Sequence, residues 1–135
     1  MKRFVYAYML GWCSSNNVVV VGITRATITL MGEKESEVEL IVDTGSILTW
    51  VKRGTLQKIG VKPRWEKEFR TIEGRIIKRK TGLIAIRHDG AEAGIEVVFG
   101  DRGDAEVLGV TALEGLGMEV DPVTRVLKRT SLLAL

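Results

Sequence analysis

The feature that most constrains this chain is a short apolar run, residues 40–42, that leads directly into the carboxylate of Asp43. A run of this kind is typical of a buried strand. A lone buried carboxylate is strongly unfavourable, so Asp43 requires hydrogen-bond donors nearby. The next residues, Thr44, Gly45 and Ser46, supply two hydroxyls and a glycine that permits a tight turn. Taken alone, this stretch favours a structural turn over a catalytic site, because all four residue types are turn formers.

The size and composition of the chain indicate one globular domain. Its 135 residues, 45% of them hydrophobic and 27% charged, are enough for one hydrophobic core. We predict a single domain over residues 18–135, after an N-terminal extension over residues 1–17. The apolar part of that extension is too short to span a bilayer, and no cleavage pattern follows it. Three interpretations of the extension stay open: an added strand, a disordered segment or a misassigned start.

Cysteine and histidine are too few for several classes of site. The one cysteine, Cys13, excludes an internal disulfide and favours a reducing compartment, so we expect a cytoplasmic protein. Together with the one histidine, His88, it cannot build a familiar zinc site. We therefore expect no metal, no cofactor and no membrane association. The scarcity of Asn and Gln beside many Arg, Glu and Val hints at a thermophilic source.

The positive charge of the chain is concentrated in residues 52–80. This stretch holds eleven Lys and Arg against three Glu, a net charge of +8, while the rest of the chain carries −5. Such a field attracts nucleic acid or an acidic substrate. The stretch lacks the interleaved aromatic residues that stack on bases, so a solvated surface on alternating strands is favoured. Nucleic acid is therefore not the expected partner.

The hydrophobic patterns predict a mostly β domain with one or two short helices. Glycines and polar clusters separate the strands, and we expect Thr55 and Thr111 to cap the two helices. The predicted elements are a hairpin over 23–42 with its turn at 32–36, a strand at 47–51, a helical turn at 55–59 ended by Gly60, a long hairpin over 66–87 that turns at Glu73-Gly74, a turn at 88–90, strands at 95–99 and 107–110, a helix at 111–116 with Glu114 completing a capping box and Gly117 ending it, and a last strand bracketed by 126–127 and 132–133.

Three features occur in a characteristic order along the chain. Asp43-Thr44-Gly45 follows an apolar strand, a hairpin tip lies near Gly74, and Val107-Leu108-Gly109 precedes a short helix. This set resembles the retropepsin-type aspartic proteases, which include the retroviral proteases and their single-lobe archaeal and bacterial relatives. The resemblance covers about residues 22–128. It implies a closed, barrel-like β lobe of six to seven strands that works as a homodimer.

The resemblance also implies an activity and a set of site residues. The chain has one Asp-Thr-Gly triplet, so one copy would supply half of a site for the hydrolysis of peptides or unfolded proteins. Asp43 would share a proton with its partner copy and activate water, Thr44 would lock the dimer, and Gly45 would donate its N–H to the carboxylate. The Ser46 hydroxyl would also bond Asp43. The residues that would contact substrate are Ser46, Glu73, Gly74, Arg75, Leu108 and Gly109.

One departure from the retroviral pattern leaves alternatives open. The retroviral members usually carry Arg after the apolar-apolar-Gly step and a partner Asp after the triplet. In this sequence those regions read Val110 and Ile47-Leu48, so both charges are missing together. Two alternatives remain: a catalytically weak dimer that serves as a peptide- or protein-binding module, and a small basic β-barrel that binds nucleic acid.

Overall fold

The computed structural model describes residues 23–130. The predictions for residues 1–17, for the start of the domain at 18–22, for the strand segment at 132–133 and for Cys13 lie outside these residues. The described part is mostly β with two short helices, as the sequence predicted. Its elements are β1 (Arg25–Met31), β2 (Glu35–Val42), β3 (Thr49–Lys52), α2 (Arg53–Lys58), β4 (Trp65–Arg70), β5 (Ile76–His88), β6 (Ala91–Gly100), β7 (Val107–Leu108), α3 (Val110–Leu116), β8 (Met118–Val120) and β9 (Leu127–Arg129).

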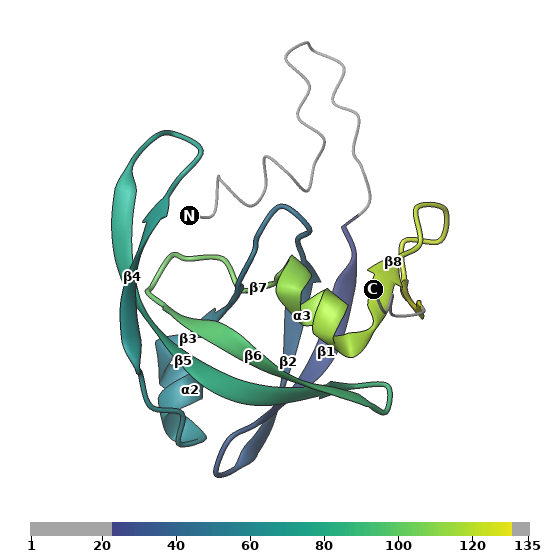
Figure 1. The fold of residues 1–135 in the computed structure, drawn as a ribbon, viewed down its shortest axis with the longest axis horizontal. Coiled ribbons are helices and arrows are strands. Elements are labelled where there is room, and N and C mark those ends of the chain that lie inside the picture. Colours follow the sequence, from purple (N-terminus) through teal and green to yellow (C-terminus); the bar gives the residue numbers. More distant parts are fainter. Residues whose placement is uncertain (1–22, 131–135) are drawn as a thin grey trace, which may run out of the picture.

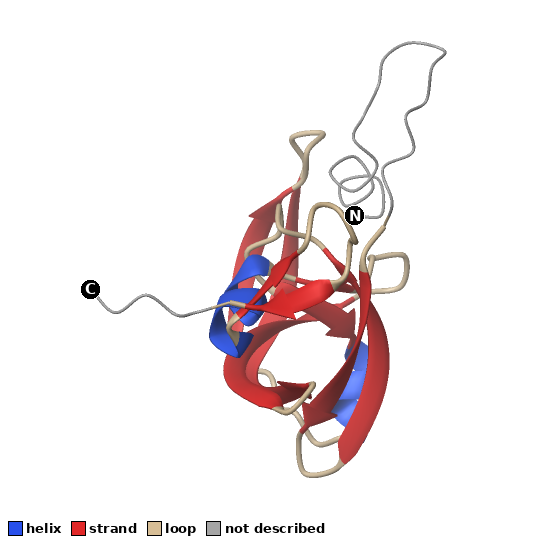
Figure 2. Ribbon diagram, turned by 90° about the vertical axis from the view of Figure 1, so that its right-hand side faces the viewer, coloured by secondary structure: helices blue, strands red, loops and turns tan. Residues whose placement is uncertain are grey.

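Seven of the strands form one strongly curled sheet (Figures 1 and 2). Their order is β1-β2-β7-β3-β6-β5-β4, and β1 also pairs with β5, so the sheet turns back on itself. Two pairings are parallel, β2 with β7 and β3 with β6. The first of these places Val42 beside Leu108 and so brings together two motifs that are far apart in the sequence.

Two apolar clusters lie on opposite faces of this sheet. Successive side chains of a strand point to opposite faces. On β3, Val51 belongs to the main core whereas Trp50 belongs to the second cluster. On β7, Leu108 and Val107 divide in the same way. The run of branched residues in this part of the chain is therefore explained by strands that are buried on both faces.

Both helices begin earlier than the sequence predicted. Neither has a side-chain cap: α2 begins two residues before Thr55, and α3 begins one residue before Thr111. The Thr111 hydroxyl donates to the carbonyl of Ile47 at 2.7 Å, so the predicted capping box with Glu114 is wrong. The predicted end of α3 is confirmed, because Gly117 adopts the left-handed conformation with φ of 67°.

The hairpin β4–β5 confirms the predicted turn at Glu73-Gly74 and projects beyond the sheet. Gly74 has φ of +86°, a conformation that glycine adopts without strain. The turn is closed by Thr71, whose N–H donates to the Arg75 carbonyl at 2.8 Å and whose hydroxyl accepts from the Arg75 N–H at 3.1 Å. Figures 1 and 2 show that this tip and the loop joining β2 to β3 lie at the same end of the molecule.

A largely buried ion pair fixes the base of this hairpin. Arg79 on β5 donates to both carboxylate oxygens of Asp104, at 2.8 and 3.2 Å. The two side chains are only 16% and 6% exposed. Asp101 joins the pair through Arg79 at 3.5 Å and through Arg53, at the start of α2, at 3.0 Å. The hairpin is thus tied to the loop that leads into β7.

We predict that Asp104→Ala lowers the free energy of unfolding by about 3 kcal/mol, because it leaves the buried Arg79 charge undercompensated. Urea denaturation at one fixed protein concentration measures this loss. The control is Arg25→Ala, which removes a pair with Glu39 whose side chains are 57% and 60% exposed. The control should lose less than about 1 kcal/mol. Equal losses in the two variants would contradict a structural role for the buried pair.

Candidate active site

Asp43 lies at the carboxyl end of β2, where the pairing with β7 continues one step past the strand. The Ile41 N–H donates to the Glu106 carbonyl at 3.4 Å, and the Asp43 N–H donates to the Leu108 carbonyl at 3.0 Å. Residues two apart in such a ladder share a face, so the Asp43 side chain lies on the same face as Ile41. Asp43 is only 1% exposed. The structure therefore buries the carboxylate, as the apolar run before it suggested.

The carboxylate of Asp43 is only half satisfied by its own chain. The Gly45 N–H donates to Oδ1 at 2.9 Å, which is the contact expected from the sequence. Oδ2 is buried and has no hydrogen-bond partner among residues 23–130. Burial raises the pKa of Asp43 above its ordinary value of 3.8, and the bond from Gly45 opposes this rise only in part. A buried carboxyl with an unpartnered oxygen can hold a proton or share one.

The expected bond from the Ser46 hydroxyl to the Asp43 carboxylate is not present. The Ser46 hydroxyl donates to the Leu48 carbonyl at 2.7 Å, and the Ser46 N–H donates to the Asp43 carbonyl at 3.1 Å. Ser46 is 7% exposed, so its hydroxyl serves the loop. Thr44, in contrast, is exposed on the surface of the same loop. The dimer contact that the resemblance implies for Thr44 would be made with a second copy of the chain.

The loop after Asp43 is held against the start of α3. The Val110 N–H donates to the Ser46 carbonyl at 2.8 Å, and both the N–H and the hydroxyl of Thr111 donate to the Ile47 carbonyl, at 3.2 and 2.7 Å. A side chain at Gly109 would overlap the carbonyl oxygen of Leu48. Glycine is therefore required here for close backbone approach. Leu108 thus meets Asp43 through the backbone, and Gly109 meets the loop that follows Asp43. Their predicted contact with substrate stays a prediction.

The other predicted substrate residues, Glu73, Gly74 and Arg75, lie at the tip of the β4–β5 hairpin. Within residues 23–130, the Asp43 carboxylate accepts from Gly45, and its other oxygen has no hydrogen bond from this tip. The tip and the loop that joins β2 to β3 lie at the same end of the molecule (Figures 1 and 2). Two parts of the predicted site, at the ends of β2 and β7, therefore contact each other through their backbones. The third part, the hairpin tip, is separate from this contact.

Thr49 and Trp50 contribute to the site, although no sequence pattern predicted a role for either residue. The Thr49 hydroxyl is fully buried and accepts a bond from the Gly109 N–H at 3.0 Å, which is a third link between the two loops. Trp50 is 4% exposed and packs edge-on against Phe69 of the hairpin, with ring centroids 4.9 Å apart. A single hydroxyl inside the apolar run 47–51 was the signal for Thr49, since a buried hydroxyl needs a partner. No local signal marks Trp50.

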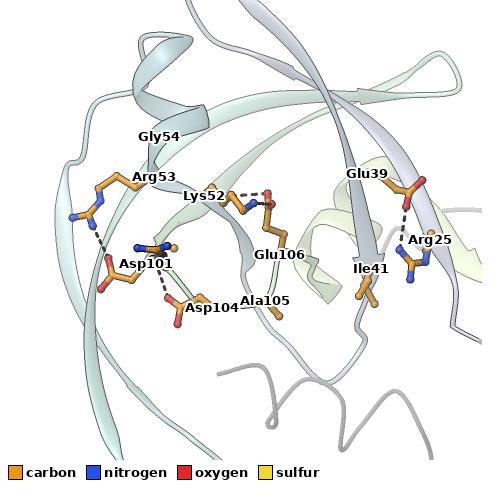
Figure 3. A pocket seen from close by; sticks show the side chains of 13 residues that line it. Arg25, Glu39, Ile41, Lys52, Arg53, Gly54, Asp101, Asp104, Ala105 and Glu106 are labelled. Atoms are coloured by element: carbon orange, nitrogen blue, oxygen red, sulfur yellow. Dashed lines mark hydrogen bonds and ion pairs between the residues drawn. The ribbon is translucent and has the colours of Figure 1, made fainter.

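A cavity of about 580 Å³ opens beside the site on the outer part of the same sheet face (Figure 3). It reaches Ile41 and Ala105 but not Asp43. Its rim carries ion pairs between Arg25 and Glu39, 3.1 Å apart, and between Lys52 and Glu106, 3.7 Å apart. The complete lining is Arg25, Glu39, Ile41, Lys52, Arg53, Gly54, Gly100, Asp101, Arg102, Gly103, Asp104, Ala105 and Glu106.

The basic stretch over residues 52–80 is partly offset by acidic residues from outside it. Besides the pair of Arg79 described above, Lys67 pairs with Glu96 of β6 at 2.6 Å. Trp65 is 44% exposed, and the Arg64 guanidinium and the Lys67 ammonium group lie 5.1 and 5.7 Å from the centroid of its ring. Exposed aromatic and cationic groups therefore meet at Trp65. The interpretation of the stretch as a solvated surface stays a prediction.

A search with models of known protein families found no match, and a search of curated proteins found no matching sequence. Within residues 23–130, no helix has the length and apolar character to cross a membrane. The same residues contain no group of three or more His, Cys, Asp or Glu placed to hold a metal ion. The retropepsin resemblance therefore rests on the order of the motifs in the sequence.

We predict that Gly109→Ala destabilises the protein by about 1–3 kcal/mol, because its methyl group would press on backbone that cannot rotate away. The matched control is Gly54→Ala in α2, where an added methyl group meets no atom within 4 Å. That change should be neutral or stabilise by up to about 1 kcal/mol, since alanine favours helix. Thermal unfolding of both variants tests this, and a tolerated Gly109→Ala would contradict the close approach.

We also predict that Asp43→Asn changes the pH dependence of stability. A carboxyl with a raised pKa stabilises the folded state below its unfolded pKa, and this contribution is lost as pH rises through the raised value. The wild type should therefore lose stability relative to Asp43→Asn between pH 4 and pH 7, by about 2–6 °C in Tm. Differential scanning calorimetry across this range measures the difference. If the Tm of Asp43→Asn minus the Tm of the wild type became smaller as pH rises, this result would contradict the raised pKa of Asp43.

Proposed function

We propose that this chain is an aspartic endopeptidase that acts as a homodimer, with one Asp43 from each copy forming the catalytic pair. The observation that carries the proposal is the buried, half-satisfied carboxylate: Oδ1 accepts from Gly45 and Oδ2 is buried without a partner. Leaving such a group unpaired is unfavourable. A second carboxyl that shares a proton with Oδ2, together with a water molecule, would complete its surroundings.

The proposed pair would use one carboxyl as a base and the other as an acid. Two carboxyls in contact cannot both ionise, so they hold one proton between them, and the raised pKa of Asp43 favours that state. The ionised carboxylate takes a proton from water, which attacks the scissile carbonyl. The protonated carboxyl polarises that carbonyl and later supplies the proton that the leaving amine needs. The titration belongs to the pair and gives an acidic, bell-shaped rate profile.

Several features of the fold support the same proposal. The extra pairing of β1 with β5 gives the sheet the curled form expected of a closed lobe. The exposed Thr44 is available to meet its counterpart in a second copy. The missing Arg and Asp of the retroviral pattern have a local substitute. Thr111 and the carbonyl of Ile47 tie α3 to the loop by hydrogen bonds, so this connection needs no ion pair.

The direct test is cleavage of an unfolded, fluorescently labelled protein between pH 3 and pH 7. We predict that Asp43→Asn lowers kcat/KM by at least about 10³-fold, since it removes the group that transfers the proton. Asp89→Asn is the control, because Asp89 is an exposed turn residue whose φ of 48° asparagine also tolerates. The control should keep full activity. Cleavage that survives in Asp43→Asn would rule out the proposed chemistry.

A mixing experiment tests the need for two copies. Wild type is unfolded and refolded together with an equal amount of Asp43→Asn, so that subunits pair at random. Activity per wild-type chain should fall to about one half, and to about one tenth with a ninefold excess of the variant. Light scattering on the same sample gives the mass, to be compared with 14.9 kDa for one chain. Unchanged activity per wild-type chain would show that single copies act alone.

A further inference from the structure

A second cavity, of about 430 Å³, is lined by α2 and by the β4–β5 hairpin. Arg53 and Gln57, one turn apart on α2, line it from the helix, and Lys78 and Lys80, two residues apart on β5, line it from the hairpin. It adjoins the cavity described above, because Arg53 and Asp101 line both. The basic stretch over residues 52–80 therefore borders a hollow in the surface that is large enough to hold part of a ligand.

The two cavities differ in how their positive charges are compensated. In the first, Arg25, Lys52 and Arg53 have carboxylate partners at 3.1, 3.7 and 3.0 Å. In the second, Lys78 and Lys80 are exposed, and neither forms an ion pair with any residue of the described chain, although a glutamate of β4 lies opposite each of them. The lining of the second cavity holds four Lys and Arg against two Asp and Glu, a net charge of +2. This cavity therefore favours an anionic ligand.

An exposed aromatic side chain lies next to the second cavity along the chain. Pro63 and Glu66 both line the cavity, so Arg64 and Trp65 lie between two lining residues. Successive side chains of a strand point to opposite sides, so the Trp65 ring lies on the other side of β4 from Glu66. Because β4 is the last strand of the sheet, a flexible chain can pass around its edge from the cavity to the ring.

The ring of Trp65 already serves as a stacking surface for two cations. The Arg64 guanidinium and the Lys67 ammonium group both lie within 6 Å of its centroid. Such contacts are weak at an exposed site, so a flat base can replace one of the cations. The displaced cation stays beside the ring, where it is available to a phosphate.

Single-stranded nucleic acid is the ligand that matches both features. Proteins bind it with cations that follow the phosphates and with aromatic rings on which bases stack. An acidic peptide would use the lysines and leave the ring unused, and a duplex keeps its bases paired away from such a ring. We propose that a single strand of nucleic acid binds at the second cavity, with its phosphates at Lys78 and Lys80 and a base stacked on Trp65. This inference goes beyond the proposed cleavage of peptides and does not depend on it.

The first test measures affinity and its dependence on salt by fluorescence anisotropy, with a fluorescein-labelled oligothymidine of about twelve nucleotides. The wild type should bind with a Kd of about 1–100 μM near 0.15 M salt. The double variant Lys78→Gln/Lys80→Gln should bind about tenfold more weakly and lower the slope of log K against log salt by about 1.4, because it loses two phosphate contacts. The control, Lys128→Gln/Arg129→Gln, removes the same charge from β9, which belongs to the separate two-stranded sheet, and should keep the slope of the wild type.

The second test separates base stacking from attraction by charge alone. Trp65→Leu should weaken binding about fivefold or more with an unchanged salt slope, and Trp65→Phe, which keeps a ring, should retain most of the affinity. Unlabelled oligothymidine should displace the probe at lower concentration than a duplex of equal length or a polyglutamate peptide. Asp43→Asn should bind like the wild type, so the result stands whether or not the protein cleaves peptides. The absence of binding, equal losses in the two double variants, no effect of Trp65→Leu, or equal displacement by polyglutamate or by duplex overturns the proposal.

Discussion

The close approach of Gly109 to the carbonyl of Leu48 is the constraint on which the candidate site depends. Any side chain at Gly109 would occupy the place of that oxygen, so the start of α3 can lie against the loop after Asp43 only with glycine there. Three backbone bonds to residues 46 and 47 and to the Thr49 side chain then become available. They set the path of the loop, and the path of the loop decides that Gly45 points its N–H at Asp43. Much of the geometry at Asp43 is thus settled by a position 66 residues further along the sequence.

The burial of Asp43 works against the stability of the isolated chain. Its surroundings supply one donor and exclude water from the other oxygen, which is an arrangement that proteins otherwise avoid. Nearby residues do not relieve it: the Ser46 hydroxyl, the closest candidate in sequence, donates to Leu48 instead. Such unrelieved polar burial tends to concentrate where a group must change its protonation state. The same local feature is therefore unfavourable in a monomer and would be useful in the proposed catalytic pair.

Sequence patterns predicted the elements that neighbouring residues determine. They failed where a contact with a residue far away in the sequence determines the structure. The turn at Gly74 and the end of α3 at Gly117 were predicted because glycine accepts left-handed backbone angles without strain. The caps at Thr55 and Thr111 were wrong. Thr111 has a better acceptor in the carbonyl of Ile47, which no helix pattern contains. The short strand β8 has three residues, too few for a periodic signal, and was missed. Trp50 resembled any other strand residue until its contact with Phe69 on another strand was known.

The parallel pairing of β2 with β7 also orders events during synthesis and folding. The links between the loop and α3 join residues 60 and 64 positions apart, so they can form only after nearly the whole domain has been made. Contacts between residues so far apart in the sequence form slowly, because closing a long loop costs conformational entropy before the contact is made. A nascent chain that has not yet reached residue 109 therefore has Asp43 in a solvated segment, with an ordinary carboxylate and no site. The geometry described at Asp43 therefore forms only after residues 109–111 have been synthesised.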